Sequence, residues 1–327
     1  MVHKLRLAHV PTPLWRNDGL DALVGAEVWV KRDDMTGGVE AGNKIRKLEY
    51  LLAEARACGA AAVVTCGGLQ SNHARATAIL ARQLGMRAIL FLRCSASLPP
   101  STERGNAFLD ALAGAEIRFI TAEQYRERNA LMADAAAELA AGGEQAYVIP
   151  EGGSSGLGAL GYVDAMAELR EQLDAGLSGA PREFDAVVHA CGSGGTAAGV
   201  ALGAAQSAIA PRTWAIAVCD DRTYFEAVTA KLIAEARTLE PALGAPNQLE
   251  ILDRFKGPAY GVVSDEQARF IVQVARVSGL ILDPVYTGKA LFGLATATDK
   301  PRRALFIHTG GLPGLLGQAS DLLPHLT

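Results

Sequence analysis

The sequence has no apolar run long enough to cross a bilayer, and a proline interrupts its N-terminal stretch MVHKLRLAHVPTPLW where a signal peptide would need apolar residues. It also lacks a strong charge imbalance. Its 31 basic and 35 acidic residues give a net charge of −4, which argues against a nucleic-acid partner or an anionic membrane surface. We therefore expect a soluble, cytoplasmic protein that binds neither nucleic acid nor membrane.

Metal-binding and redox spacings are missing as well. The six histidines show no HExxH spacing, and the five cysteines show no CxxC spacing. We expect no metal site, and we expect the cysteines to be reduced thiols that pack as small apolar side chains.

The sequence is rich in glycine, with 35 residues, and short apolar runs alternate with alanine-rich helical stretches. This alternation is typical of βα units around a parallel sheet, so it predicts an α/β fold. The predicted strands cover residues 27–33, 61–67, 86–93, 116–120, 145–151, 185–192, 213–219 and 303–311.

Two glycine-rich segments, TGGVEAGN and EGGSSGLGALG, flank a compact block of strand and helix units. We predict that residues 47–157 form a small domain and that residues 1–46 and 158–327 together form a large one. The cleft between two such lobes is a usual position for a ligand.

The loop ACGSGGTAAGVALG follows a predicted strand and leads into a helix. Glycine backbone amides and a helix N-terminus together favour an anion, so the loop predicts a phosphate cradle. It matches neither the dinucleotide fingerprint nor the P-loop, and a tight turn that uses glycine for packing is the alternative. The cradle residues would be Gly192, Ser193, Gly194, Gly195 and Thr196.

Three more loops follow strand ends, where open α/β sheets bind ligands. In LQSNHARAT, Ser71 or Asn72 can cap a helix whose first amides suit a carboxylate, although ordinary capping explains the motif equally well. The segments DPVYTGKALFGL and IHTGGLPGLLG could each be plain turns, and we expect Lys289 of the former to be solvated.

Lys44 in AGNKIRKLEY is the unusual cation, because a helix N-terminus is an unfavourable place for an ammonium group. Neighbouring Arg46 and Lys47 would lower its pKa further and make its amine a better nucleophile and base. An amine, a phosphate cradle and a carboxylate site together indicate pyridoxal phosphate, whose aldehyde condenses with lysine and then with an amino-acid substrate.

Five ordered motifs, GNKIRKLEY, LQSNHARAT, GSGGTAAG, DPVYTGKA and HTGGLPGL, resemble the D-cysteine desulfhydrase and 1-aminocyclopropane-1-carboxylate (ACC) deaminase family of fold-type II pyridoxal phosphate enzymes. The similarity extends from about Pro11 to Leu316. It implies two open, twisted, mostly parallel sheets flanked by helices, with the cofactor in the interdomain cleft, and it implies a homodimer.

The resemblance also implies roles for individual residues. Lys44 would bind the cofactor covalently and remove the Cα proton, with Ser71 and Tyr286 as further catalytic groups. Other cofactor contacts would come from Asn72, the cradle residues 192–196, Thr287 and Thr309. The substrate would contact Ser71, Asn72, His73, Tyr260 and Tyr286.

Ring-opening members of the family have Glu at position 287 and Leu at position 309, whereas this sequence has threonine at both. A neutral hydroxyl near the pyridine nitrogen gives a weaker electron sink, which suits the loss of a good β leaving group. We therefore expect a β-eliminating lyase that converts D-cysteine to pyruvate, ammonia and sulfide. An L-cysteate sulfo-lyase, an ACC deaminase, an amino-acid racemase and a non-catalytic binding protein are the alternatives. Ile45 and Glu151 depart from the family pattern, so the substrate could differ from the usual one.

Overall fold

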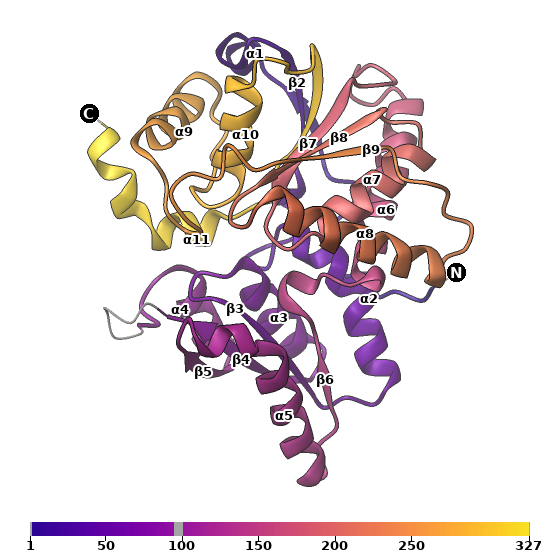
Figure 1. The fold of residues 1–327 in the computed structure, drawn as a ribbon, viewed down its shortest axis with the longest axis vertical. Coiled ribbons are helices and arrows are strands. Elements are labelled where there is room, and N and C mark those ends of the chain that lie inside the picture. Colours follow the sequence, from indigo (N-terminus) through magenta and orange to yellow (C-terminus); the bar gives the residue numbers. More distant parts are fainter. Residues whose placement is uncertain (1, 95–100, 327) are drawn as a thin grey trace.

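The computed structural model describes residues 2–94 and 101–326, which form two sheets, each flanked by helices (Figure 1). In Figure 1 the six-stranded sheet lies in the upper part of the molecule and the four-stranded sheet lies below it. Helix α2 (Asn43–Ala57) lies near the junction and packs against α6 (Gly156–Asp174) of the upper part. The expected α/β architecture of two mostly parallel sheets is confirmed.

The larger sheet has the strand order β1-β2-β10-β7-β8-β9, and only the β1–β2 pair in it is antiparallel. Its central strands are buried along almost their whole length because helices cover both faces. The strands are β1 (Leu14–Arg16), β2 (Glu27–Lys31), β7 (Ala186–Cys191), β8 (Arg212–Ala217), β9 (Gln248–Leu252) and β10 (Arg303–Ile307). Its other helices are α1 (Asp18–Val24), α7 (Gly195–Gln206), α8 (Arg222–Leu239), α9 (Asp265–Ser278), α10 (Thr287–Thr296) and α11 (Leu312–Gly317).

The smaller sheet is entirely parallel and has the order β5-β4-β3-β6. Its strands are β3 (Ala62–Gly68), β4 (Arg87–Arg93), β5 (Glu116–Ile120) and β6 (Ala146–Val148). Its helices are α3 (Asn72–Gln83), α4 (Gly105–Leu112) and α5 (Arg128–Ala141). Short 3-10 turns are η1 (Asp33–Met35), η2 (Gln124–Glu127), η3 (Glu151–Gly153), η4 (Ala319–Asp321) and η5 (Leu323–His325).

All eight predicted strands are present, although the predictions for 145–151 and 303–311 extend past the last strand residue into functional loops. The prediction missed β1, which has only three residues, and β9, which is a half-exposed edge strand. All four strands of the smaller sheet lie within residues 47–157, but α2 begins before that range. The domain boundaries themselves stay a prediction.

Within the described ranges, no helix is both long and apolar enough to span a membrane. The five cysteines are free thiols, and Cys66 and Cys191 are buried as expected. Cys58, at the end of α2, is exposed instead, because the capping position of the helix faces solvent.

Candidate active site

Lys44 lies in the first turn of α2, where the chain passes the carboxyl end of β10. The preceding Gly42 has φ +125°, and a Cβ there would come within 2.8 Å of the Thr309 carbonyl oxygen. Asn43 donates its backbone N–H to that same oxygen at 3.1 Å. Only glycine fits this close approach, so the motif AGNK fixes the place where the lysine helix begins.

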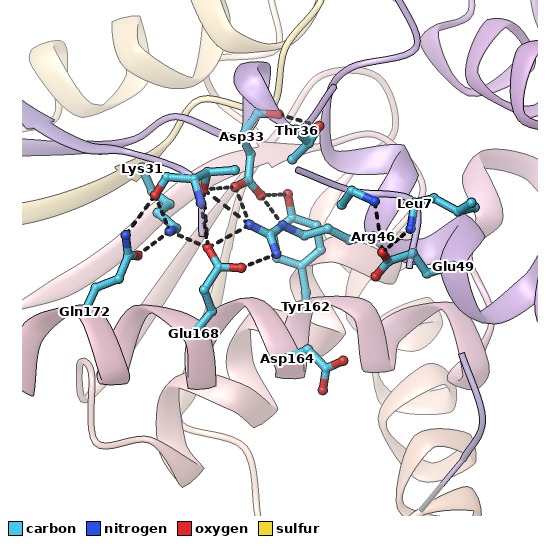
Figure 2. Close-up of polar contacts among 12 residues, drawn as sticks. Leu7, Lys31, Asp33, Thr36, Arg46, Glu49, Tyr162, Asp164, Glu168 and Gln172 are labelled. Atoms are coloured by element: carbon cyan, nitrogen blue, oxygen red, sulfur yellow. Dashed lines mark hydrogen bonds and ion pairs between the residues drawn. The ribbon is translucent and has the colours of Figure 1, made fainter. Parts of the chain in front are cut away.

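A buried ion network around Arg46, two residues after Lys44, anchors the helix that carries both (Figure 2). Arg46 donates two hydrogen bonds of 2.8 Å to the fully buried Asp33 and a third of 2.8 Å to Glu168 on α6. Tyr162 donates to Asp33 at 2.7 Å, and Lys31 of β2 pairs with Glu168 at 2.6 Å. Such a network is costly to break, because removing one partner leaves buried charge unpaired.

The Lys44 side chain borders two adjoining cavities. We call the first the loop compartment, because the glycine loop after β7 forms most of its wall. The described residues lining it are Asn43, Lys44, Asn72, Ala190, Cys191, Gly192, Ser193, Gly194, Thr196, Ala197, Tyr286 and Thr309.

The predicted cradle residues form the turn that leads into α7. Gly194 has φ +83° and caps the helix without a side chain. A Cβ at Gly195 would come within 2.7 Å of Ser154 Oγ and 2.8 Å of Lys47 Nζ, so the turn is packed tightly against polar groups. Asn43 also reaches the turn, because its side-chain amide donates to Thr196 Oγ1 at 3.1 Å. A 12-residue helix that begins in a glycine turn is well suited to bind a phosphate.

Lys47 belongs to this cradle, although the sequence analysis passed over it. Its buried amine donates to the Gly152 carbonyl at 3.2 Å and to Ser154 Oγ at 3.4 Å, and it pairs with no carboxylate among the described residues. Burial, and then the charge of Lys44, lower its pKa well below the usual value. The spacing of three residues from Lys44 could have revealed it, because residues i and i+3 share one face of a helix.

A chain of hydrogen bonds determines which end of the Asn72 amide faces the loop compartment. Arg75 carries only donors, and it donates to Asn106 Oδ1 at 3.2 Å. The Asn106 amide nitrogen must then face away from Arg75, and it donates to Asn72 Oδ1 at 3.0 Å and to the Gln70 carbonyl at 2.9 Å. Asn72 therefore presents its NH₂ group, a donor, to the loop compartment.

We call the second cavity the tyrosine compartment. It shares Lys44, Gly192, Ser193 and Tyr286 with the loop compartment. The described residues lining it are Lys44, Cys66, Gly67, Gly68, Ser71, His73, Glu151, Gly152, Gly192, Ser193, Tyr260 and Tyr286.

Ser71 and the start of α3 form one wall of the tyrosine compartment. Ser71 Oγ caps the helix by accepting from the Ala74 N–H at 3.1 Å, which leaves its hydroxyl hydrogen available to a ligand. A carboxylate at this helix start would also meet the positive end of the helix dipole.

His73 is a neutral residue with a defined tautomer. Thr65 Oγ1 donates to the Ile149 carbonyl at 2.8 Å, so it must accept from His73 Nε2 at 2.9 Å. The proton therefore lies on Nε2, and Nδ1 is a buried acceptor without a partner among the described residues. Burial, with the charges of Lys44 and Lys47, lowers the pKa of His73 well below its usual value.

Tyr260 and Tyr286 line the same compartment as Ser71, and their hydroxyl oxygens are 2.7 Å apart. Lys289 holds the loop that carries Tyr260, because its amine donates to the carbonyls of Lys256 at 2.6 Å and Ala259 at 2.9 Å. The expectation that Lys289 is solvated was wrong. The first turn of α10 faces the core rather than solvent.

The structure separates the two threonines that the sequence analysis placed near the pyridine nitrogen. Thr309 lines the loop compartment. Thr287 is fully buried and outside the described lining residues, and its hydroxyl donates to Asp283 at 2.6 Å. Thr309 is therefore the threonine whose side chain can meet a ligand directly.

The pKa of Lys44 is lowered to about 8, chiefly because burial disfavours the ammonium form. Glu151 and Cys191 raise it in part. The direction agrees with the sequence analysis, but the cause differs. The charge of Arg46 is already paired with Asp33 and Glu168, so burial of the amine is the main cause.

These features fit pyridoxal phosphate. The unpaired Lys47 amine and the glycine turn suit its phosphate, the Asn72 donor suits an oxygen on its ring, and the Lys44 amine suits its aldehyde.

Comparisons with known proteins give the same cofactor. A family model described as "Pyridoxal-phosphate dependent enzyme" matches residues 5–310. The bifunctional D-cysteine desulfhydrase/ACC deaminase of Arabidopsis thaliana is 40% identical over 334 residues, which cover 98% of this chain and 81% of the relative. A putative ACC deaminase of Thermotoga maritima is 39% identical over 322 residues, which cover 98% of this chain and 100% of the relative.

Solved structures agree on the fold. The crystal structure of an ACC deaminase homologue matches with a TM-score of 0.87 and 38% identity, covering 99% of this chain and 96% of that one. The L-serine ammonia-lyase of Rhizomucor miehei matches with a TM-score of 0.65 at 18% identity, covering 98% of both chains, and shows a likeness of fold alone. This chain therefore belongs to the pyridoxal-phosphate dependent enzymes of fold-type II, and within them it is a lyase of the D-cysteine desulfhydrase and ACC deaminase family.

Proposed function

We propose that this enzyme catalyses β-elimination on a small β-substituted amino acid and that D-cysteine is its principal substrate, yielding pyruvate, ammonia and hydrogen sulfide. One observation carries the proposal: no carboxylate is present among the described residues that line the loop compartment, and Thr309 offers a neutral hydroxyl there. A neutral partner leaves the cofactor a weaker electron sink, which suffices for a good leaving group such as hydrosulfide.

The binding residues come from both sheets. The cradle at 192–196 and Lys47 would bind the cofactor's phosphate, and the Asn72 amide would donate to its ring oxygen. Ser71 and the start of α3 bind the substrate carboxylate, which orients Cα above the Lys44 amine.

Chemistry requires one proton to leave Cα and one bond to the β substituent to break. The cofactor, when bound, supplies the electron sink that makes this proton acidic. Lys44 Nζ accepts the proton, and its lowered pKa suits a base that works near neutral pH. The paired hydroxyls of Tyr260 and Tyr286 line the tyrosine compartment, where they can pass a proton to the departing sulfur. Water then hydrolyses the released enamine to pyruvate and ammonia.

Ring opening of ACC is the second candidate. Relatives that share 39–40% of the sequence carry ACC deaminase in their names, and the Arabidopsis relative carries both activities. L-cysteate elimination is a third candidate, and racemisation on the same cofactor is a fourth.

A substrate panel tests the proposal. The purified holoenzyme is incubated with D-cysteine, L-cysteine, L-cysteate, D-serine and ACC, and pyruvate, 2-oxobutyrate, sulfide, sulfite and the enantiomer of each substrate are measured. We expect pyruvate and sulfide in equal amounts from D-cysteine, and no product from Lys44→Ala. Dominant formation of 2-oxobutyrate from ACC, or of sulfite from L-cysteate, would overturn the assignment. The exposed Lys231, whose substitution should change nothing, provides the matched control.

A further inference from the structure

Glu151 introduces a carboxylate into the tyrosine compartment. It is the one acidic residue among the described residues that line this cavity, and it lies in η3, on the wall shared with Gly152. The other polar groups in the described lining are the Lys44 amine, the neutral His73, the hydroxyls of Ser71 and Ser193, and the two tyrosine hydroxyls. A substrate's β substituent in this compartment therefore meets one carboxylate, whereas the remaining acceptors there are neutral.

Two residues behind this wall hold the carboxylate in place. Tyr125 donates its hydroxyl to Glu151 Oε1 at 2.6 Å, and Arg128 Nε lies 2.9 Å from Oε2. Neither partner lines the compartment, so the cavity faces the carboxylate and not the guanidinium. Each carboxylate oxygen accepts more than one hydrogen bond, and the Glu151 side chain is still 34% exposed. Acceptor capacity is therefore left for a ligand.

Aromatic rings pack against the nearby cations. The Arg128 guanidinium lies 5.0 Å from the Tyr125 ring, and Arg93 stacks between Tyr125 at 4.7 Å and Tyr260 at 5.4 Å. Both guanidiniums reduce the negative potential of Glu151 from behind, but neither one is among the described residues that line the tyrosine compartment. An anionic β substituent would consequently meet the Glu151 carboxylate and would find no hydrogen-bond donor from Arg93 or Arg128.

We propose that Glu151 is a specificity-determining residue that selects amino acids whose β substituent donates a hydrogen bond or carries positive charge, and that disfavours anionic β substituents such as a sulfonate. The selected class includes thiol, hydroxyl and ammonium groups. This inference rests on the proposed function for the position of the substrate, and it makes L-cysteate a poor substrate.

The first test measures binding without turnover. 3-Hydroxypropanoate and 3-sulfopropanoate have the substrate carboxylate but no amino group, so they bind the holoenzyme without reacting. We expect wild-type enzyme to prefer the hydroxyl compound. Glu151→Gln, which keeps the shape and removes the charge, should tighten binding of the sulfonate by roughly tenfold.

Arg128→Met is the control with the opposite expected effect, because it removes the positive charge that compensates Glu151 from outside the cavity. It should bind the sulfonate more weakly than wild type does. General damage to the compartment would instead weaken binding of both ligands in Arg128→Met and in Glu151→Gln. Glu151→Val serves as a second charge-removing variant if the glutamine variant folds poorly. A hydroxyl-to-sulfonate ratio that stays within twofold of wild type in Glu151→Gln and Glu151→Val would overturn the inference.

The second test uses turnover. Cysteate, serine and 2,3-diaminopropionate of the accepted chirality are compared by kcat/KM, and the sulfonate should gain relative to the ammonium compound in Glu151→Gln. The two proposals can fail separately. If the enzyme eliminates from no amino acid, the proposed function fails, but the ratio of 3-hydroxypropanoate to 3-sulfopropanoate binding can still be measured and still tests the role of Glu151.

Discussion

The side-chain oxygen of Asn72 accepts a hydrogen bond from the Asn106 amide nitrogen at 3.0 Å, and this contact turns the Asn72 NH₂ group toward the cavity beside Lys44. The direction is set from behind by Arg75, which can only donate. A residue on α4 thus determines whether the active site meets its cofactor with a donor or an acceptor.

Replacing Asn106 with Asp should flip the side-chain amide of Asn72. An aspartate beside Arg75 accepts but does not donate, so Asn72 would turn its nitrogen toward it and present an oxygen to the cofactor. We expect cofactor binding to weaken by about 1–2 kcal/mol, roughly tenfold, and the visible absorbance band of the holoenzyme to shift. Asn106→Ala should have a smaller effect. In an Asn72→Ala background the Asp substitution should change the spectrum no further, and additive effects would contradict the account.

Lys47→Met should weaken cofactor binding without stopping chemistry. The amine is positioned to bind the phosphate through a charge-assisted hydrogen bond worth about 1.5–3 kcal/mol. We expect the dissociation constant for pyridoxal phosphate to rise roughly 10- to 100-fold, as measured by absorbance titration of the apoenzyme. Saturating cofactor should restore most activity. Lys231→Met, at a 77% exposed position, should bind normally, and equal affinities in the two variants would exclude this role for Lys47.

Cofactor incorporation should depend on pH through Lys44. Its pKa is lowered from 10.5 to about 8, so the neutral amine that attacks the aldehyde predominates above about pH 8. Below that pH the ammonium form predominates, and the rate of incorporation into apoenzyme should fall about tenfold per pH unit. Stopped-flow absorbance between pH 6 and pH 10 measures this directly. A rate that still rises steeply up to the ordinary lysine pKa would show that burial does not lower the pKa.

Arg46→Met should destabilise the whole fold. The substitution leaves the Asp33 carboxylate fully buried beside Tyr162 without its cation, so we expect the free energy of unfolding to fall by about 3–5 kcal/mol. Urea denaturation followed by circular dichroism measures the loss. Arg87→Met removes an exposed pair with Glu116 and Glu144 and should cost at most about 1 kcal/mol. Similar losses in the two variants would contradict the difference in burial.

Much of this architecture could be predicted from the sequence, because buried parallel strands appear as short apolar runs. The glycine turn at 192–196 and the Ser71 cap were equally visible, since both depend on local chain geometry. Lys289 was misjudged and the role of Lys47 was missed, because a sequence does not show which lysines near the start of a helix face the protein interior. The amide chain from Arg75 to Asn72 depends on α3 packing against α4, a contact that no local pattern contains.

The predicted contact between Thr287 and the cofactor depended on the position of this residue in the sequence. Its neighbourhood in sequence suggested a contact with the cofactor, but its hydroxyl is held by Asp283, four residues earlier in the chain. Of the two threonines, Thr309 is the one among the described residues that line the loop compartment.

We propose that Lys44, and not the more deeply buried Lys47 one turn further along α2, binds the cofactor covalently. Reduction of the holoenzyme with borohydride fixes the cofactor to its lysine, and peptide mass spectrometry with fragmentation then locates it. We predict that the added mass lies on Lys44 in the peptide that contains AGNK. A label on Lys47, or on Lys289 beside the Tyr260 loop, would contradict the account.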